Sequence, residues 1–492
     1  MRARLATVAC VLVGCGAPDL AADDASSDAL TVDVTDAPDA ADASDALTRD
    51  GSDAFVADAS DALTRDGLDA VVPDASDASA TDAADVPDAA PPPPMGAVLY
   101  TADRSLSPIT ADVVSALAAI VRRGTGTLAR EFSKVGDSNT VNTGFLACFA
   151  GANVDLAGRP ALQPTLDLFR TGRLGGTTPF DRVSLAATVG WSVGSALAGS
   201  PSPVARELAA VTPRYATVMF GTNDIQARDI DRYAVGMWTL TDALLAAGVI
   251  PLVTSIPARA DNADADAWVP RYNAVARALA QSHRVPYIDA HRELARIPRR
   301  GLGGDNLHLN VYAPSGAARG CVFTAAGLQY GHNVRNLLTL QTLDRVVSVT
   351  ARGAAAPDRD APRLAGDGSV EAPYVIAALP FVDGGDTRAS NTRAIARYTG
   401  CMAAADESGP ERWYRLDVAR PTRVRAQVFV RGATDVDLHL VDRTGSAAGC
   451  VRRDDKTLTV DLAPGRWYLV VDSYVAAGTS RAGEYLFTVL AE

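Results

Sequence analysis

Residues 131–139 read EFSKVGDSN and residues 215–224 read YATVMFGTND. Each segment begins with a short run typical of a β-strand. A glycine follows this run, and after it come polar residues whose side chains could take part in catalysis. Strand-like runs lie at 131–135, 182–188, 215–220, 249–255 and 284–289. Amphipathic helical patterns lie between several of them, most clearly at 229–247 and 270–283. We therefore predict an α/β fold with a parallel sheet covered on both faces by helices.

The carboxyl ends of parallel strands form the usual ligand-binding edge of such a sheet, so chemistry is expected there. Ser138 follows the first strand, Asn223 follows the third, and Asp305 and His308 follow the fifth. A serine at a strand-to-helix turn exposes its hydroxyl near backbone N–H groups that can stabilise negative charge. The three-residue spacing of Asp305 and His308 would place both on one side of a helical turn, as a base and its orienting group require. These residue types together predict an acyl-transfer site.

The motifs Gly136-Asp137-Ser138, Gly221-Thr222-Asn223-Asp224 and Asp305-Asn306-Leu307-His308-Leu309 resemble the first, third and fifth blocks of the SGNH (GDSL-like) hydrolases. Gly190, in the run Ala187 to Trp191, is the best match to the second block. The resemblance implies a three-layer, flavodoxin-like α/β/α fold and hydrolysis of an acyl ester, often an acetyl ester, on a sugar or lipid. By this resemblance Ser138 is the nucleophile, His308 the base and Asp305 its orienting group, while Ser138, Gly190 and Asn223 form the oxyanion hole. No cofactor is implied.

A second serine motif competes with this interpretation. Residues 190–194 read GWSVG, which fits the G-x-S-x-G nucleophile elbow of α/β-hydrolases, with Ser192 as the nucleophile. That alternative leaves the Gly136 and Asn223 motifs without a role, and it does not explain the close spacing of Asp305 and His308. We therefore favour Ser138. No H-E-x-x-H motif or clustered Cys/His spacing predicts a metal site, and His283, His291 and His332 are expected to be packed or surface residues.

The last part of the chain has a different pattern. Residues 351–365 are rich in Ala, Pro, Arg and Asp and are typical of a linker. Period-two alternation follows at 413–418, 424–430, 436–441, 467–471 and 485–489. Short strands at this spacing predict an all-β antiparallel sandwich over 366–492. The segments DVDLHLVD, APGRWYLVVD and AGEYLFTV resemble the bacterial pre-peptidase C-terminal (PPC-like) domain, and we expect no catalysis there because His439 is its only histidine.

The N-terminus has the layout of an export signal. Arg2 and Arg4 precede a nine-residue apolar run, which is too short to span a bilayer as a helix. The sequence Leu12-Val13-Gly14-Cys15 resembles a bacterial lipoprotein cleavage box, so residues 1–14 are the expected signal peptide and Cys15 the lipidated first residue of the mature chain. An ordinary cleaved signal with a chance cysteine is the alternative. Diacylation with N-acylation would anchor the chain stably to a membrane, with the outer membrane favoured.

Residues 15–95 form the acidic part of the chain. The formal net charge is -12, and residues 16–95 hold 20 Asp against two Arg, so residues 96–492 carry only +4. The sequence DASDALTRDG occurs at 42–51 and again at 58–67. This composition predicts a disordered tether with an r.m.s. span of about 50 Å. Calcium binding by the repeats is disfavoured because the glycine turn and closing glutamate of an EF-hand are missing. A charge of +4 does not predict nucleic-acid binding.

The cysteines fit an oxidising compartment. Cys148 and Cys321 lie in the middle region, and Cys401 and Cys450 lie in the C-terminal region. Two cysteines in each region predict two disulfides, each within one domain, although four buried thiols are the alternative. We predict an anchored esterase of the cell envelope with a hydrolase domain at 96–350, whose partners are a glycan or lipid ester and the membrane. A surface binding lipoprotein with an inactive hydrolase domain is the alternative.

Overall fold

A four-stranded parallel sheet forms the centre of the middle region in the computed structural model, which describes residues 96–492. The predicted signal peptide, Cys15 and the acidic tether lie outside the described residues. The strands, in the order β1-β2-β3-β4, are β1 (Leu128–Gly136), β2 (Pro213–Met219), β3 (Ile250–Thr254) and β4 (Tyr287–Ile288). All residues of β3 are buried, as expected for a central strand covered on both faces. The predicted parallel α/β sheet is confirmed.

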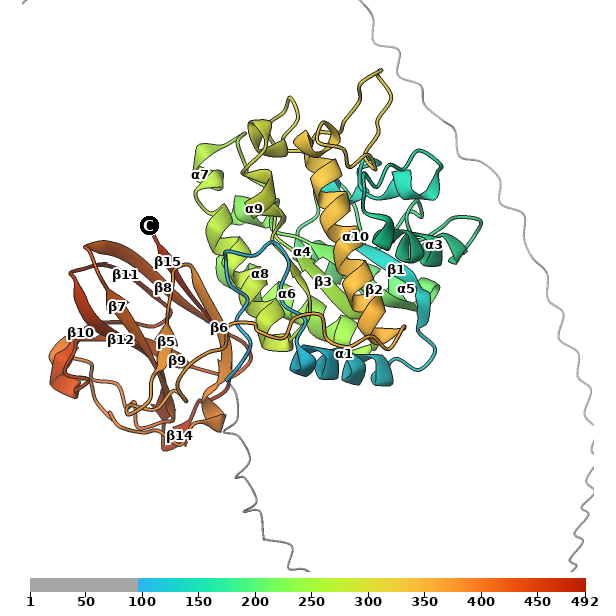
Figure 1. The fold of residues 1–492 in the computed structure, drawn as a ribbon. Helices are drawn as coiled ribbons and strands as arrows, with labels where there is room; N and C mark the ends of the chain where they lie inside the picture. The colour runs from blue at the N-terminus through green and yellow to red at the C-terminus, as the bar shows by residue number, and fades with distance from the viewer. Residues whose placement is uncertain (1–95) are drawn as a thin grey trace, which may run out of the picture. The chain divides into compact units, whose positions relative to one another are not determined.

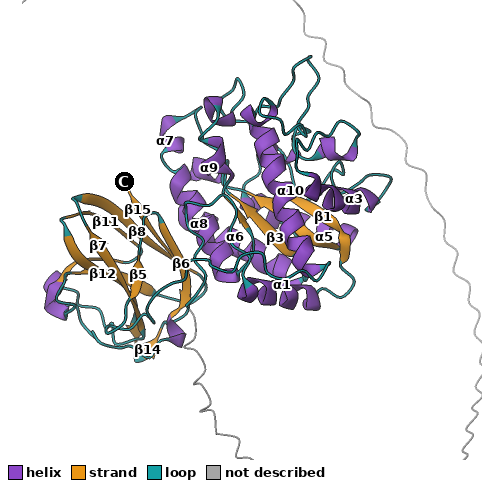
Figure 2. Cartoon of the chain, in the orientation of Figure 1, coloured by secondary structure: helices purple, strands orange, loops and turns teal. Residues whose placement is uncertain are grey.

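Helices cover the sheet in two groups (Figures 1 and 2). In one group, α10 contacts α3 and α9; in the other, α5, α4, α6 and α8 contact one another in turn. The helices are α1 (Ala111–Arg123), α2 (Ser138–Val141), α3 (Gln163–Thr171), α4 (Val193–Leu197), α5 (Pro203–Val211), α6 (Ile230–Ala246), α7 (Ala263–Asp266), α8 (Val269–His283), α9 (Ala290–Leu294) and α10 (Gly331–Thr350). The two helices predicted most clearly from the sequence, α6 and α8, end within one residue of the predicted bounds.

The predicted second strand, 182–188, is not a strand. Only one parallel bridge, Gly136 to Ala187, joins this segment to the free edge of β1. Of its backbone N–H groups, that of Thr188 donates to the carbonyl of Gly136 in β1, whereas that of Leu185 donates to Glu207 and that of Ala186 to Ser184. The segment still occupies the position of the second strand in a flavodoxin-like order, beside β1 and opposite β2.

Lys134 explains why β1 tolerates a cation at this edge. Its ammonium group is buried and donates a hydrogen bond to the carbonyl of Phe180 at 3.0 Å. Burial lowers the pKa of Lys134 to about 8. The side chain therefore joins β1 to the segment that replaces the second strand.

The C-terminal region is a sandwich of two sheets, β10-β9-β12-β7-β5 and β11-β8-β15-β6, with strands and loops as its main components (Figure 2). All pairs are antiparallel except β5 with β7, which is parallel. The strands are β5 (Tyr374–Ile376), β6 (Phe381–Asp386), β7 (Glu411–Val418), β8 (Thr422–Val430), β9 (Val436–Val441), β10 (Cys450–Asp454), β11 (Thr457–Leu462), β12 (Gly465–Ser473), β13 (Val475–Ala476), β14 (Thr479–Ser480) and β15 (Glu484–Ala491). The predicted all-β sandwich is confirmed.

Helix α8 is covered on two sides. It contacts β3 and β4 of the parallel sheet, and it also contacts β6 and β15 of the sandwich. Val382 and Leu486 of the sandwich belong to the same apolar cluster as Val275 and Leu279 of α8. The described residues, 96–492, accordingly all belong to one unit of contacts. The segment after α10 is also packed, because the N–H of Leu99 donates to the carbonyl of Pro362.

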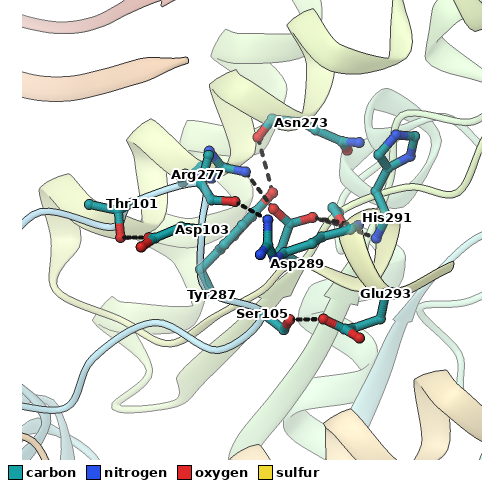
Figure 3. A network of polar contacts seen from close by, with 12 residues as sticks. Thr101, Asp103, Ser105, Asn273, Arg277, Tyr287, Asp289, His291 and Glu293 are labelled. Carbon is teal, nitrogen blue, oxygen red and sulfur yellow. Dashed lines mark hydrogen bonds and ion pairs between the residues drawn. The ribbon is translucent and has the colours of Figure 1, made fainter. Parts of the chain in front are cut away.

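A buried polar network fixes α8 to the end of the parallel sheet (Figure 3). The guanidinium of Arg277 donates to the carboxylate of Asp289 at 2.5 Å, and both side chains are nearly inaccessible to solvent. The hydroxyl of Tyr287 in β4 donates to the carbonyl of Asn273. Asp289 also caps α9 by accepting from the N–H of Arg292. These contacts satisfy polar groups that would otherwise be costly to bury.

Both predicted disulfides form. Cys148 pairs with Cys321, and Cys401 pairs with Cys450. None of the helices in the described part of the chain is both long and apolar enough to cross a bilayer.

Candidate active site

Ser138 lies where β1 turns into α2. The side chain of Asp137 accepts a hydrogen bond from the N–H of Asn139 at 3.0 Å and caps this short helix, so Ser138 is its first residue. Gly136 is required by close packing, because a Cβ there would lie 2.7 Å from the carbonyl oxygen of Met219. The tight strand-to-helix turn therefore presents the Ser138 hydroxyl at the carboxyl edge of the sheet.

His308 brings the three predicted side chains together. Its Nε2 lies 2.9 Å from Ser138 Oγ, and its Nδ1 lies 2.6 Å from Asp305 Oδ2. Partial burial by itself raises the pKa of Asp305. Hydrogen bonds from the His308 ring and from the N–H groups of His308 and Leu307 outweigh it and lower the pKa to about 2. Asp305 is therefore a carboxylate that can accept from Nδ1–H, which leaves Nε2 to accept from the Ser138 hydroxyl.

The loop that carries Asp305 and His308 differs from its prediction. We expected a helical turn, but residues 305–308 form a non-helical bend. Asp305 Oδ1 accepts from the N–H groups of both Leu307 and His308, and Asn306 adopts a left-handed backbone with φ of 57°. This bend brings the carboxylate of Asp305 next to the imidazole of His308. One carboxylate oxygen accepts from the backbone of the turn, and the other contacts the ring nitrogen Nδ1.

The loop is fixed to the serine turn by Asn139. Its Oδ1 accepts from the N–H of Leu309 at 3.1 Å, which joins the residue after Ser138 to the residue after His308. Arg335 of α10, itself buried, donates to the carbonyl of Asn139 and to the hydroxyl of Thr140. The Arg335 guanidinium also lies 3.6 Å over the ring of Phe145. These contacts hold the segments that carry Ser138 and His308 in fixed positions relative to each other.

Arg259 makes a comparable connection on the other side of the site. Its guanidinium donates to the carbonyl of Thr222 and to the carboxylate of Asp261. The N–H of Asp261 in turn donates to the carbonyl of Asn306. Neither Arg259 nor Arg335 belongs to a motif that the sequence singled out.

Asn223 and Gly190 lie at the same edge of the sheet. Asn223 follows β2, and its side-chain amide donates one hydrogen bond to the carbonyl of Trp191 at 2.9 Å. Its second N–H remains available for another acceptor. Gly190, adjacent to Trp191, has a positive φ of 77°, a conformation in which other residues are strained. Asp224 anchors this turn by accepting from the N–H of Val193, and burial raises its pKa to about 6.

Ser192 has different surroundings. Its hydroxyl lies 3.3 Å from the hydroxyl of Ser195, and among the described residues no imidazole is its hydrogen-bond partner. The other histidines of the middle region are packed, as expected. His332 is buried, and burial lowers its pKa to about 3. His291 lies beside Asp289 in the network of Figure 3, and burial lowers its pKa.

A cavity of 420 Å³ adjoins Asn223 and is lined by residues of α4 and α6, Arg232 and Tyr233 among them. Within residues 96–492, the groups of His, Cys, Asp and Glu close enough to share a metal ion all lie in the C-terminal sandwich. The contacts of His308 with Ser138 and Asp305 allow nucleophilic attack assisted by an imidazole and a carboxylate.

A serine, histidine and aspartate in hydrogen-bond contact at the strand ends of a parallel sheet define the class of serine hydrolases. Residues 135–312, a little over a third of the chain, match the model of the GDSL-like Lipase/Acylhydrolase family. This region is a GDSL-like hydrolase domain, and the chain is a serine hydrolase that acts on ester bonds.

Solved structures with which this chain shares a low similarity include the two that follow. A catalytic mutant of an acetylxylan esterase from Geobacillus stearothermophilus is 15% identical, with a TM-score of 0.29, and the match covers 45% of this chain and 95% of that one. The pre-peptidase C-terminal domain of a collagenase from Bacillus anthracis is 14% identical, with a TM-score of 0.16, over 23% of this chain and 89% of that one. No curated protein matches the sequence.

Proposed function

We propose that this chain is an exported, membrane-anchored esterase that hydrolyses acyl esters of carbohydrates or lipids, acetyl esters among them, with Ser138, His308 and Asp305 as its catalytic residues. The observation that carries the proposal is the continuous hydrogen-bonded array from Ser138 Oγ through the His308 ring to Asp305. Its two contacts, at 2.9 Å and 2.6 Å, are within reach of direct proton transfer.

The reaction follows from this geometry in two halves. As Ser138 Oγ bonds to the ester carbonyl carbon, its proton passes to His308 Nε2, and Asp305 stabilises the imidazolium that forms. The N–H groups of Ser138 and Gly190 and the free amide N–H of Asn223 stabilise the negative carbonyl oxygen. His308 then gives the proton to the departing alkoxide, which leaves an acyl-Ser138. Water, deprotonated by His308, hydrolyses this intermediate and restores the serine.

The location is proposed from the sequence alone. The export signal at 1–14 and lipidation of Cys15 support anchoring in a bacterial membrane, with the outer membrane favoured, and residues 15–95 are proposed as the tether that holds the folded part away from it. We propose domain limits of 96–350 for the hydrolase, 351–365 for the linker and 366–492 for the sandwich.

The half-exposed Asp305 side chain, at 52%, leaves the site open to a large substrate such as a glycan or lipid surface.

Turnover of p-nitrophenyl acetate tests the function directly. The purified chain is expected to hydrolyse it, and a fluorophosphonate probe is expected to modify the peptide that contains Ser138 and to stop turnover. A binding lipoprotein with an inactive hydrolase domain shows neither reaction, and that result would replace our proposal with the alternative.

A further inference from the structure

Three acidic residues lie side by side on one face of the C-terminal sandwich. Asp472 of β12 is directly opposite Glu411 of β7 on one side and Asp437 of β9 on the other. Glu411 and Asp472 are completely buried, and Asp437 is 6% exposed. Carboxylates placed opposite each other across neighbouring strands repel one another, so this row needs either a compensating positive charge or a bound proton.

Two more buried groups join the row. Glu407 reaches it from the segment that precedes β7, and His439 lies two residues beyond Asp437 on β9, hence on the same face of the sheet. Both side chains have no solvent exposure. One oxygen of Glu407, one oxygen of Asp437 and one ring nitrogen of His439 all lie within 4.8 Å of one another.

The neighbouring donors satisfy only part of this cluster. Arg453 donates to one oxygen of Asp437 at 3.1 Å, and the hydroxyl of Tyr398 donates to one oxygen of Asp472 at 2.7 Å. Glu411 accepts from the indole of Trp413 and from the N–H of Ala394.

Five atoms of the cluster have no hydrogen-bond partner among the described residues. They are both carboxylate oxygens of Glu407, both ring nitrogens of His439 and Asp472 Oδ1. Completely buried polar atoms are costly to leave unpaired, so this group of atoms points to a ligand.

We propose that Glu407, Asp437 and His439 bind a divalent transition-metal ion of the zinc type, which fastens the segment before β7 to the face of the sheet. Imidazole with two carboxylates suits zinc, whereas calcium takes oxygen ligands. Bonds of about 2.0–2.2 Å to the metal require side-chain shifts of about 1 Å from the present separations. The ring of Tyr398 stacks on that of His439 at 3.6 Å, which leaves the in-plane lone pair of one ring nitrogen free to bind a metal.

The ion would have a structural role. The same segment carries Cys401, which is bonded to Cys450 at the start of β10, so metal and disulfide would secure the two ends of one covering segment. The ligands come from a loop and from alternate residues of one strand, a spacing that matches no metal motif of the sequence. The proposal does not depend on the esterase function.

The metal proposal is tested on the full-length chain, which is first treated with a chelator and returned to metal-free buffer. We expect one equivalent of Zn²⁺ to bind, to raise Tm by several degrees and to slow amide hydrogen exchange in residues 402–410 and in β9. Co²⁺ bound in its place is expected to give a visible spectrum that shows nitrogen ligation. Glu407→Gln and His439→Gln are expected to weaken Zn²⁺ binding at least 100-fold, while Glu411→Gln, whose carboxylate already has donors, binds as the wild type does.

A wild-type far-UV circular dichroism spectrum and a cooperative thermal transition confirm that each variant is folded. If Glu407→Gln or His439→Gln does not fold, the proposal is decided by the Zn²⁺ titration, the hydrogen exchange and the Co²⁺ spectrum of the wild-type chain. The competing arrangement is a proton shared between Glu407 and Asp437, because burial raises the pKa of both carboxyl groups. The absence of stoichiometric Zn²⁺ binding supports that arrangement and overturns the proposal. Equal stabilisation by Ca²⁺ also overturns it, since it would indicate the oxygen-only group of Asp435, Asp437 and Asp455.

Discussion

Ser138 and His308 are 170 positions apart along the chain, yet their side chains are in hydrogen-bond contact. This contact depends on residues that do no chemistry. The side chain of Asn139 accepts from the N–H of Leu309 and so joins the Ser138 and His308 segments. Arg335 holds Asn139 in place by donating to its carbonyl. Burial lowers the pKa of Arg335 to about 9, which shows how strongly the interior disfavours this cation. The hydrogen bonds that Arg335 donates to Asn139 and Thr140 of the serine turn offset this cost.

Asn223 is expected to stabilise the transition state rather than the bound substrate. Asn223→Ala removes the free amide N–H, so kcat should fall by about 10²–10³ while KM changes little. Steady-state kinetics with p-nitrophenyl acetate measures both. Gln329→Ala, which removes an exposed amide that donates only to the carbonyl of Ala325, is the matched control and should behave like the wild type. A kcat for Asn223→Ala within threefold of the wild type would remove Asn223 from the oxyanion hole.

The candidate catalytic residues could be predicted from sequence because each follows a strand-like run and carries a reactive group. Ser138, Asn223, Asp305 and His308 all satisfy both conditions, and the structure places the three proton-transfer groups in contact. Arg259 and Arg335 could not be predicted in this way. Their role is to donate to backbone carbonyls, and any arginine in a helix or loop can do so once the fold brings a carbonyl near it.

At the scale of elements, helix α8 shows where sequence patterns lose information. Its apolar spacing predicted a helix with one buried face, but residues all around it are buried, because the parallel sheet covers one side and the sandwich the other. The strand at 182–188 was predicted from its apolar residues, yet Val183 and Leu185 are exposed and the backbone donates to side chains. Strand β10 was missed because its residues CVRRD show no apolar alternation.

The contact between α8 and β6 predicts a pH-dependent stability. Asp383 is buried there and accepts from Gln281 and from the hydroxyl of Tyr414. Burial raises its pKa to about 6, whereas an unfolded Asp titrates near 3.9. The native state thus holds this proton more tightly, so the free energy of unfolding should fall as pH rises from about 4 to about 6, by about 3 kcal/mol.

Denaturant unfolding of Asp383→Asn measures this contribution. The variant does not ionise at this position, so its free energy of unfolding should lack that fall between pH 4 and pH 6. Asp461→Asn, which changes an exposed carboxylate on β11, should keep the wild-type pH dependence. An unchanged pH dependence in Asp383→Asn would show that Asp383 ionises as readily in the native chain as in the unfolded one.

At the scale of the whole molecule, the acidic segment separates a proposed lipid anchor from the folded part. Cys15→Ser removes the proposed acylation site, so the esterase should move from the membrane fraction to the soluble fraction of bacteria that export it. Cell fractionation followed by an immunoblot measures the distribution. Cys10→Ser, a cysteine change inside the expected signal peptide, is the control and should leave the chain in the membrane fraction. Retention of Cys15→Ser in the membrane would argue for another mode of attachment.

The identity of the nucleophile is the most direct test of the account as a whole, because it decides between the two serine motifs. We predict that Ser138→Ala lowers kcat/KM for p-nitrophenyl acetate by a factor of about 10³ or more, while Ser192→Ala stays within a few-fold of the wild type. Both variants should unfold at the wild-type temperature. Full activity in Ser138→Ala together with loss of activity in Ser192→Ala would contradict the account.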